Sequence, residues 1–472
     1  MTELTAAEAA LASEKDEFLR IEMRGLEPVP DSQRHGHPRE LFFIWAAALA
    51  DFFSILAGQL LISVIGLGVW DSILVLVLGA VAGAALLGLL SVTGTRSGAP
   101  QIVFSRLAFG RRGAAIGGTL TALIAVGFFS YDCAIAVSTA RALPVFGSGP
   151  PAWGVALMLL AMIVGCILVA MFGHRTITLV QTVQAPTFIV LALVVAVVLA
   201  PRFHPGYTSN LAPGPHVAAM LLGFTATFAL IVSWATYAGD YSRYLPRRTG
   251  APAVTLWSGA GALTTLVLCG VIGVLVQSSE PQNLDFAGLI VRHLPTWLAW
   301  VFVAFIVIAE MSSNYLNLYT GALSALASGI RLPRWRAALV FGLLGGALAA
   351  FVLAQGDKFE SVYLNFLTVT YVWFPAWCIV VLIDFWRRGD TEQQFLGSSR
   401  ESRLPAWRWP ALATFGLGTG ATLLFFQEPS FYQGALARVF FRDQPADISA
   451  FVGVAVSAAL FLLLSRRTPA RA

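Results

Sequence analysis

Residues 297–327 read WLAWVFVAFIVIAEMSSNYLNLYTGALSALA. A helix needs about 20 mostly apolar residues to cross the hydrocarbon core of a bilayer, and this stretch is long and apolar enough to do so. Its middle is polar, because Glu310, Ser313, Asn314 and Asn317 follow one another at i, i+3, i+4 and i+7 and share one helix face. A charged side chain at that depth costs roughly 2.5–3.5 kcal/mol on insertion scales, so an intramembrane carboxyl group indicates a function.

The composition extends this interpretation to the whole chain. Of its 472 residues, 57% are hydrophobic and 12% are charged, and its mean hydropathy is +0.75, whereas soluble domains carry about 25% charged residues. We therefore predict an all-α polytopic membrane protein with about 12 transmembrane helices. These lie at residues 41–66, 70–94, 114–138, 152–172, 177–200, 217–244, 254–277, 297–327, 337–355, 362–386, 409–427 and 447–465.

The basic residues predict the orientation of these helices. If the N-terminal segment is inside, the inner segments hold 24 of the 30 lysines and arginines and the outer segments hold six. This bias follows the positive-inside rule and places both termini in the cytoplasm, as expected of a multi-pass protein of the cell membrane. The net charge of +5 is explained in this way without nucleic acid as a partner.

Polar stretches divide the chain into parts. Residues 1–40 form a polar cytoplasmic tail without the apolar core of a signal peptide. Residues 41–386 form a ten-helix core, 387–408 a cytoplasmic loop, 409–465 two additional helices and 466–472 the cytoplasmic C-terminus. The four cysteines lie inside apolar stretches without metal-ligand spacing, which argues against a disulfide framework and a metal site.

Polar groups at membrane depth occur in the first, third, sixth and eighth predicted helices. They include Asp51, Asp132, Asp240 and Glu310. In two five-helix halves, at about 41–200 and 217–386, the first helix corresponds to the sixth and the third to the eighth. Such a pattern is typical of inverted-repeat transporters, whose site lies at the midplane beside broken helices.

Two small-residue pairs are the expected breaks in the first and sixth helices, namely Ala57-Gly58 and Ala238-Gly239. Phe128 and Asp132 share a helix face, since they are four residues apart. An aromatic ring one turn from a hydrogen-bonding group suits a flat, polar ring. Trp234 lies too deep for the interfacial aromatic belt, which favours a binding role over ordinary packing.

Some of these groups have simpler explanations. A lone intramembrane serine, such as Ser130 or Ser233, is as readily explained by a hydrogen bond between helices as by a ligand contact. Asp240 lies about one turn from Arg243 at the predicted cytoplasmic end of its helix, so that a gating or structural ion pair explains both. For Asp51, Asp132 and Glu310 we expect a role in the site or in coupling.

Six short motifs occur in order along nearly the whole chain. They are Ile21 to Pro30, Trp45, Gly98 to Gln101, Ser105 to Gly110, Gly127 to Ser130, and Gly239 to Pro246. In this order and spacing the chain resembles the nucleobase–cation symporter-1 family, and within it the purine–cytosine permease branch. The resemblance implies a LeuT-type fold, with a 5+5 inverted repeat plus two helices. It also implies alternating access and cation-coupled uptake of a nucleobase, with no cofactor beyond the coupling cation.

The resemblance also implies roles for individual residues. The substrate ring would lie between Phe128 and Trp234, and its edge would be read by Asn314 or Asn317 together with the group at Asp132. A sodium site described for some members would take its half in the eighth helix from three residues, Ala309, Ser312 and Ser313.

Two positions depart from the family pattern. Asp51 stands where asparagine is frequent, and Asp132 stands where an amide is usual. Both add protonatable groups, so H+ is at least as good a candidate as Na+ for the coupling cation. A carboxylate only accepts hydrogen bonds, so Asp132 favours a ring edge rich in N–H donors, as in guanine or protonated cytosine.

Other functions remain open on the sequence. A hydantoin, allantoin or a thiamine-like vitamin would also be a flat heterocyclic substrate. A membrane-embedded enzyme would need a nucleophile or a metal cluster at depth, and His174 alone, in a short turn, offers neither. A sensor would usually add a soluble signalling domain, and the rings of like charge that mark a channel are not visible in one chain.

Overall fold

The computed structural model describes residues 16–143, 145, 151–354, 370–388, 396, 404–428, 432–442, 444 and 446–465. These residues form a bundle of helices with one two-stranded ribbon, in which β1 (Gln427–Glu428) pairs antiparallel with β2 (Tyr432–Gln433). Parts of the predicted tail 1–40, of the helix 362–386 and of the loop 387–408, and all of the C-terminus 466–472, lie outside the described residues.

Eight spans of the described chain are long and apolar enough to cross a membrane. Two of them continue through short helices: α9 (His174–Leu199) into η3 (Ala200–Arg202), and α10 (Pro213–Val232) into η4 (Ala235–Tyr237) and α11 (Ala238–Ser242). The other six are α4 (Val69–Ser97), α7 (Ala114–Arg141), α8 (Ala152–Phe172), α12 (Ala251–Gln277), α14 (Thr296–Ala327) and α15 (Arg334–Ala354).

The remaining spans are broken or shorter. The first consists of α2 (Arg39–Ala48) and α3 (Phe52–Ser63), which meet at an angle of 60°. Three shorter helices coincide with the last predicted spans, namely α17 (Phe374–Arg388), α19 (Trp409–Phe425) and α21 (Ser449–Leu464). Together these elements confirm the prediction of an all-α protein with about 12 transmembrane helices.

Short helices cap or connect the spans. They are η1 (Asp31–Gln33), α5 (Gln101–Phe104), α6 (Arg106–Phe109), α13 (Phe286–His293) and α20 (Ala435–Phe441). Of these, α5 meets the end of the sixth span, where its first amide contacts Asp240.

The helix breaks lie elsewhere than the sequence predicts. The first span breaks at residues 49–51 and the sixth at 233–237, whereas Gly58 lies inside α3 and Gly239 inside α11. Both glycines serve close helix packing instead. A Cβ on Gly58 would meet the Gly270 carbonyl of α12 at 1.8 Å, and one on Gly239 would meet the side chain of Gln101 at 2.5 Å.

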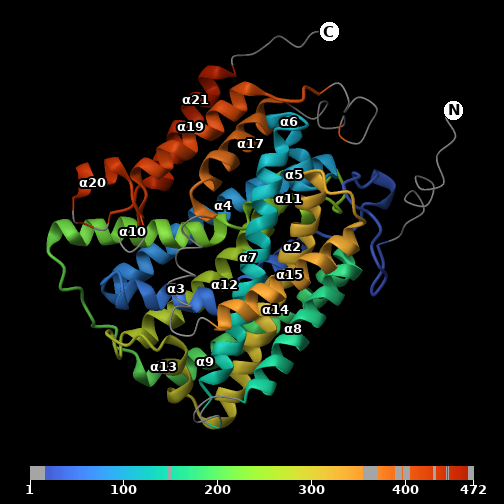
Figure 1. Cartoon of the computed structure of the whole chain (residues 1–472). Helices are drawn as coiled ribbons and strands as arrows, with labels where there is room; N and C mark the ends of the chain where they lie inside the picture. Colours follow the sequence, from blue (N-terminus) through green and yellow to red (C-terminus); the bar gives the residue numbers. More distant parts are fainter. Residues whose placement is uncertain are drawn as a thin grey trace, which may run out of the picture.

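In Figure 1, α2 and α11 lie near the middle of the bundle, and α3 and α10 extend from there toward one side. Helix α7 packs along α14, and α12 packs against α2, α3 and α4. Helices α17, α19 and α21 lie together on one flank, away from α8 and α9. The third and eighth spans, α7 and α14, therefore face one another beside the broken first and sixth spans.

Candidate functional site

The break between α2 and α3 is held by two carboxyl groups. Asp51 is the N-cap of α3, and its Oδ1 accepts a hydrogen bond from the Ser54 amide at 2.9 Å. Glu310 of α14 accepts another from the Phe52 amide at 3.0 Å through its Oε1. Free amides at a helix start attract negative charge, so the break draws both acidic side chains toward it.

The carbonyl end of the break faces α14 as well. The Ser313 hydroxyl donates to the Ala48 carbonyl at 2.7 Å, and the Ser54 hydroxyl donates to the Leu49 carbonyl at 2.7 Å. Ala309 and Ser312 are fully buried on the same part of α14. The structure thus brings the predicted cation residues of the first and eighth spans together.

Oε2 of Glu310 and Oγ of Ser312 are buried here without a hydrogen-bond partner among the described residues. A buried polar atom without a hydrogen bond costs free energy, roughly 1–3 kcal/mol. Oxygen atoms left in this way beside backbone carbonyls are suited to hold a small cation or a proton.

The second cluster joins α7 to α14. Asn317 donates from Nδ2 to Asp132 Oδ2 and to Asn314 Oδ1, each at 3.1 Å. Asn314 in turn donates to the Phe129 carbonyl at 3.2 Å. Asp132 is 2% exposed, and its Oδ1 receives no hydrogen bond from the described residues. One oxygen of this carboxyl group is therefore left for another donor.

Aromatic side chains surround the break in the sixth span. Trp234 is 9% exposed and lies edge-to-face on Trp45 and on Tyr237, with ring centroids 6.2 and 5.3 Å apart. Tyr237 donates to Asn317 Oδ1 at 3.1 Å, which links this break to the polar cluster. Phe128 is half-buried on α7, one turn before Asp132.

Three carboxyl groups thus gather near the middle of the bundle, those of Asp51, Asp132 and Glu310. They are close enough for their charges to act on one another. Among the described residues, none of them forms an ion pair with an arginine, a lysine or a histidine. No group of three His, Cys, Asp or Glu side chains in the described part of the chain is arranged to hold a metal ion.

Asp240 and Arg243 do not form the ion pair that their spacing predicts. Asp240 instead accepts a hydrogen bond from the Gln101 amide at 2.7 Å and so caps α5. Arg243 pairs with Glu22 of the tail at 3.2 Å. The physical reason is that the first amide of α5 needs an acceptor, whereas Glu22 supplies the carboxylate for the arginine.

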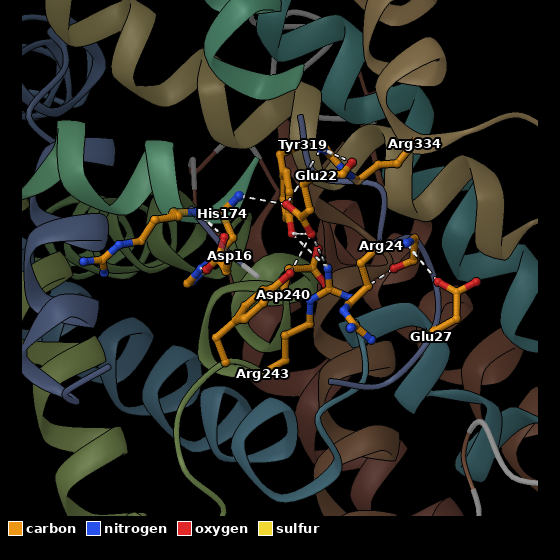
Figure 2. A network of polar contacts seen from close by, with 12 residues as sticks. Asp16, Glu22, Arg24, Glu27, His174, Asp240, Arg243, Tyr319 and Arg334 are labelled. Atoms are coloured by element: carbon orange, nitrogen blue, oxygen red, sulfur yellow. Dashed lines mark hydrogen bonds and ion pairs between the residues drawn. The ribbon is translucent and has the colours of Figure 1, made fainter. Parts of the chain in front are cut away.

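Glu22 is the centre of a buried polar network (Figure 2). Its Oε1 accepts from Tyr244 at 2.6 Å and from Tyr319 at 3.0 Å, while its Oε2 accepts from the His174 amide at 2.8 Å. Arg334 lies 3.7 Å from the same carboxylate and donates to the Glu22 carbonyl at 3.0 Å. The tail is thereby tied to the starts or ends of α9, α11, α14 and α15.

These contacts join segments that the sequence assigns to one side of the membrane. The tail, the turn before α9, the end of α11 and the start of α15 all belong to the predicted inner segments, and they meet at Glu22. Glu22 and Arg334 are functional candidates that sequence reasoning missed. Glu22 stood inside a recognised tail motif, but nothing in that motif showed what it contacts.

A second tail carboxylate lies beside His174 (Figure 2). Asp16 is 2.8 Å from His174 Nδ1 and 3.1 Å from His35 Nε2, and it accepts from the Arg175 amide. Burial alone would raise the pKa of Asp16, but the charges of the two histidines and their hydrogen bonds outweigh it and hold the pKa well below its usual range. Asp16 therefore stays ionised at neutral pH.

The chain is similar to known proteins both in sequence and in fold. The family model described as "Permease for cytosine/purines, uracil, thiamine, allantoin" matches residues 28–453. YxlA of Bacillus subtilis, named provisionally as a purine-cytosine permease, is 25% identical over 95% of this chain and 96% of its own length. The purine-cytosine permease fcyB of Emericella nidulans is 26% identical over 94% of this chain and 88% of its own.

Solved structures show the same fold. Mhp1, a nucleobase-cation-symport-1 family transporter in a closed conformation with bromovinylhydantoin bound, superposes with a TM-score of 0.70 at 17% identity, over 93% of this chain and 94% of its own. MhsT in complex with L-phenylalanine gives a TM-score of 0.56 at 14% identity, over 90% of this chain and 97% of its own. The LeuT-type arrangement of helices is thus confirmed.

Proposed function

The chain belongs to the family of permeases for cytosine and purines, uracil, thiamine and allantoin, and we propose that it takes up a nucleobase, cytosine or a purine, together with a cation. It acts as a secondary transporter in the cell membrane and not as an enzyme. The relatives named as purine-cytosine permeases support this choice of substrate.

One observation above all supports a coupled transporter. The three buried carboxyl groups near the two helix breaks lack a basic partner in the described part of the chain. A buried charge without a partner is expensive, so the site is complete only when a cation, a proton or a substrate donor joins it.

The substrate binds between the aromatic rings and the Asp132 carboxyl group. Phe128 and Trp234 stack on the ring, and the free oxygen of Asp132 accepts from its N–H edge. Asn314 and Asn317 stand directly behind this carboxyl group. Base stacking is worth about 1–3 kcal/mol per base in nucleic-acid systems, so Trp234→Ala weakens substrate binding about 10- to 100-fold.

The cation binds at the break of the first span. Asp51, Glu310 and the Ala48 carbonyl supply negative charge and oxygen, and Ala309, Ser312 and Ser313 complete the site on α14. A proton would sit on a carboxyl group, whereas Na+ would be held by carbonyl and hydroxyl oxygens beside it. Occupation by either ion strengthens the contact between the first and eighth spans.

Transport requires that the site is open alternately to the outside and to the inside of the membrane. The four-helix bundle rocks against the rest of the protein around it; the first, second, sixth and seventh spans pack together as such a bundle, since α12 lies against α2, α3 and α4, and α10 against α4. The Arg243–Glu22 ion pair is the proposed closure on the inner side, and Asp240 holds α5 against the same end of α11. With both termini in the cytoplasm, release of the Glu22 network opens the inner path.

The function is tested with the purified full chain in liposomes. Uptake of labelled cytosine is measured under a proton gradient without sodium, and under a sodium gradient at equal pH on both sides. Unlabelled purines, uracil, a hydantoin, allantoin, thiamine and pyridoxine serve as competitors. Uptake of cytosine or a purine that follows one of the two gradients supports the proposal, whereas competition by the hydantoin, allantoin or a vitamin alone assigns a different heterocycle.

A further inference from the structure

The amide of Asn317 has no donor left for a substrate. An asparagine amide carries two N–H donors and one carbonyl oxygen. In Asn317 the nitrogen donates to Asp132 Oδ2 and to Asn314 Oδ1, while the oxygen accepts from the Tyr237 hydroxyl, all at 3.1 Å. The side chain is 1% exposed. Asn317 is therefore committed to three protein partners.

Only one orientation of this amide fits its surroundings. If it were rotated by half a turn, its oxygen would face the oxygens of Asp132 and Asn314, and its nitrogen would face the Tyr237 hydroxyl. Two acceptors would then meet without a donor between them. A tyrosine hydroxyl can donate or accept, so the Asp132 carboxylate and the Asn314 oxygen select the observed orientation, and Tyr237 then donates to the amide oxygen that faces it.

Tyr237 occupies a special place in the fold. It lies in η4, the short helix at the break of the sixth span, and its ring contacts that of Trp234. Its side chain is 1% exposed, and its hydroxyl points across to α14. Tyr237 thus contacts both Trp234, the proposed stacking ring, and the amide of Asn317, which donates to Asp132.

We propose that Tyr237 is a positioning residue for substrate recognition: through the Asn317 amide it fixes the Asp132 carboxyl group, whose other oxygen reads the substrate edge. Asn317 acts in this relay and not by touching the substrate. The assignment rests on the proposed function. It adds a residue of the sixth span to the recognition of the substrate edge, which the sequence analysis assigns to residues of the third and eighth spans.

The chain offers a matched control for this role. Tyr241 lies one turn after Tyr237, is equally buried, and also contacts α14, but its partners are the Leu316 carbonyl at 3.3 Å and the Thr320 hydroxyl at 3.4 Å. Tyr237→Phe and Tyr241→Phe each remove one buried hydroxyl from neighbouring turns. Only the first removes a hydrogen bond to the amide that holds Asp132.

The test compares initial rates of cytosine uptake in liposomes over a range of cytosine concentrations. Tyr237→Phe raises KM about tenfold, because the buried Asn317 oxygen loses its donor, and leaves the maximal rate within about twofold. Tyr241→Phe leaves both within about twofold. Equal KM values for the two variants overturn the proposal, and thermal unfolding in detergent shows whether each variant is folded.

A double variant separates a relay from two independent contacts. If Tyr237 acts through Asn317, adding Tyr237→Phe to Asn317→Ala raises KM no further than Asn317→Ala does alone. If the factors by which the two single variants raise KM multiply in the double variant, the relay is overturned. A wild-type protein that takes up no nucleobase contradicts the proposed function instead, so that the two failures are distinguished by the wild-type measurement.

Discussion

Helix α14 takes part in two buried polar clusters, which differ in whether their carboxyl groups have basic partners. At its middle, Glu310 shares a region with Asp51 and Asp132, and no basic side chain of the described residues pairs with any of them. Nearer its end, Tyr319 belongs to a cluster in which one carboxylate, Glu22, meets two arginines. The first cluster lacks a basic partner, and we call it the incomplete cluster. In the second, which we call the complete cluster, the carboxylate is paired with both arginines, although the Nε of each arginine has no hydrogen-bond partner among the described residues.

The difference separates the site of binding from the means of closure. A complete cluster of buried charges holds its parts together and is broken only at a cost. A cluster that lacks positive charge is stabilised by what comes from outside, here a cation or the N–H edge of a substrate. We infer that the middle of α14 responds to its ligands and that its end holds the protein closed.

The largest effect is expected from breaking the complete cluster. Glu22→Ala leaves Arg243 and Arg334 buried without their carboxylate, and removal of one partner of a buried ion pair costs roughly 3–5 kcal/mol. We expect a clear drop in the midpoint of thermal unfolding in detergent. We also expect faster labelling of a cysteine placed on the inner side, because the ion pairs of Glu22 with Arg243 and Arg334 no longer stabilise the closed state.

Glu17 supplies the control for this measurement. Its side chain lies in the same tail but is 51% exposed, and among the described residues it forms an ion pair with Arg20. Glu17→Ala should leave both the thermal midpoint and the labelling rate near those of the wild type. An equally small change in Glu22→Ala would show that the tail does not fasten the inner side.

The next effect concerns the incomplete cluster. Glu310→Gln keeps an oxygen for the Phe52 amide but removes the carboxylate that we propose attracts the cation. Moving one charge through 100 mV is worth about 2.3 kcal/mol, or about a 50-fold accumulation. We expect this accumulation to vanish, while exchange of labelled for unlabelled substrate across the membrane continues.

Accumulation and exchange are measured on the same liposomes. Asp71→Asn is the matched control, since Asp71 is a carboxylate that has a basic partner, His216, at 2.9 Å. That variant should accumulate substrate normally. Undiminished accumulation by Glu310→Gln would remove Glu310 from the coupling site and leave Asp51 as the remaining carboxylate there.

Much of the first cluster could be predicted from sequence, and little of the second. The stripe from Glu310 to Asn317 is a local pattern, because residues on one helix face recur at fixed spacing. Its partners on the first and third spans followed from the cost of carboxyl groups at membrane depth. The network around Glu22 has no local signature, since Glu22 and Arg334 are 312 residues apart.

The helix breaks show a second limit of sequence reasoning. Small residues such as Gly58 indicate either a break or a close packing of helices, and their identity does not distinguish the two. In the structure Gly58 packs against Gly270, whereas the first span breaks where Asp51 and Glu310 supply acceptors for free amides. The acceptors, one of them from a distant helix, mark the break.

Asp240 tests whether every buried carboxylate belongs to one of the two clusters. It lies between them and caps α5 through the Gln101 amide. Loss of a cap of this kind costs about 1 kcal/mol, so Asp240→Ala should lower the thermal midpoint moderately. Asp240→Asn retains an acceptor oxygen and should be close to the wild type. Loss of substrate accumulation in the Asn variant, with its stability unchanged, would instead place Asp240 in the coupling machinery.

The smallest effect is expected at the outer edge of the complete cluster, where Asp16 contacts His174. Because the pKa of Asp16 is lowered in the folded protein, the contact favours the ionised form and is complete above its ordinary value of 3.8. It is lost only as the pH falls below that value. Asp16→Asn imitates the protonated state at neutral pH, and we expect proteolysis of the tail to become about fivefold faster, equivalent to ~1 kcal/mol.

Asp31→Asn, at a carboxylate that is 67% exposed, is the control. If the two variants are cut at the same rate, Asp16 does not contribute to holding the tail, and the complete cluster ends at Glu22.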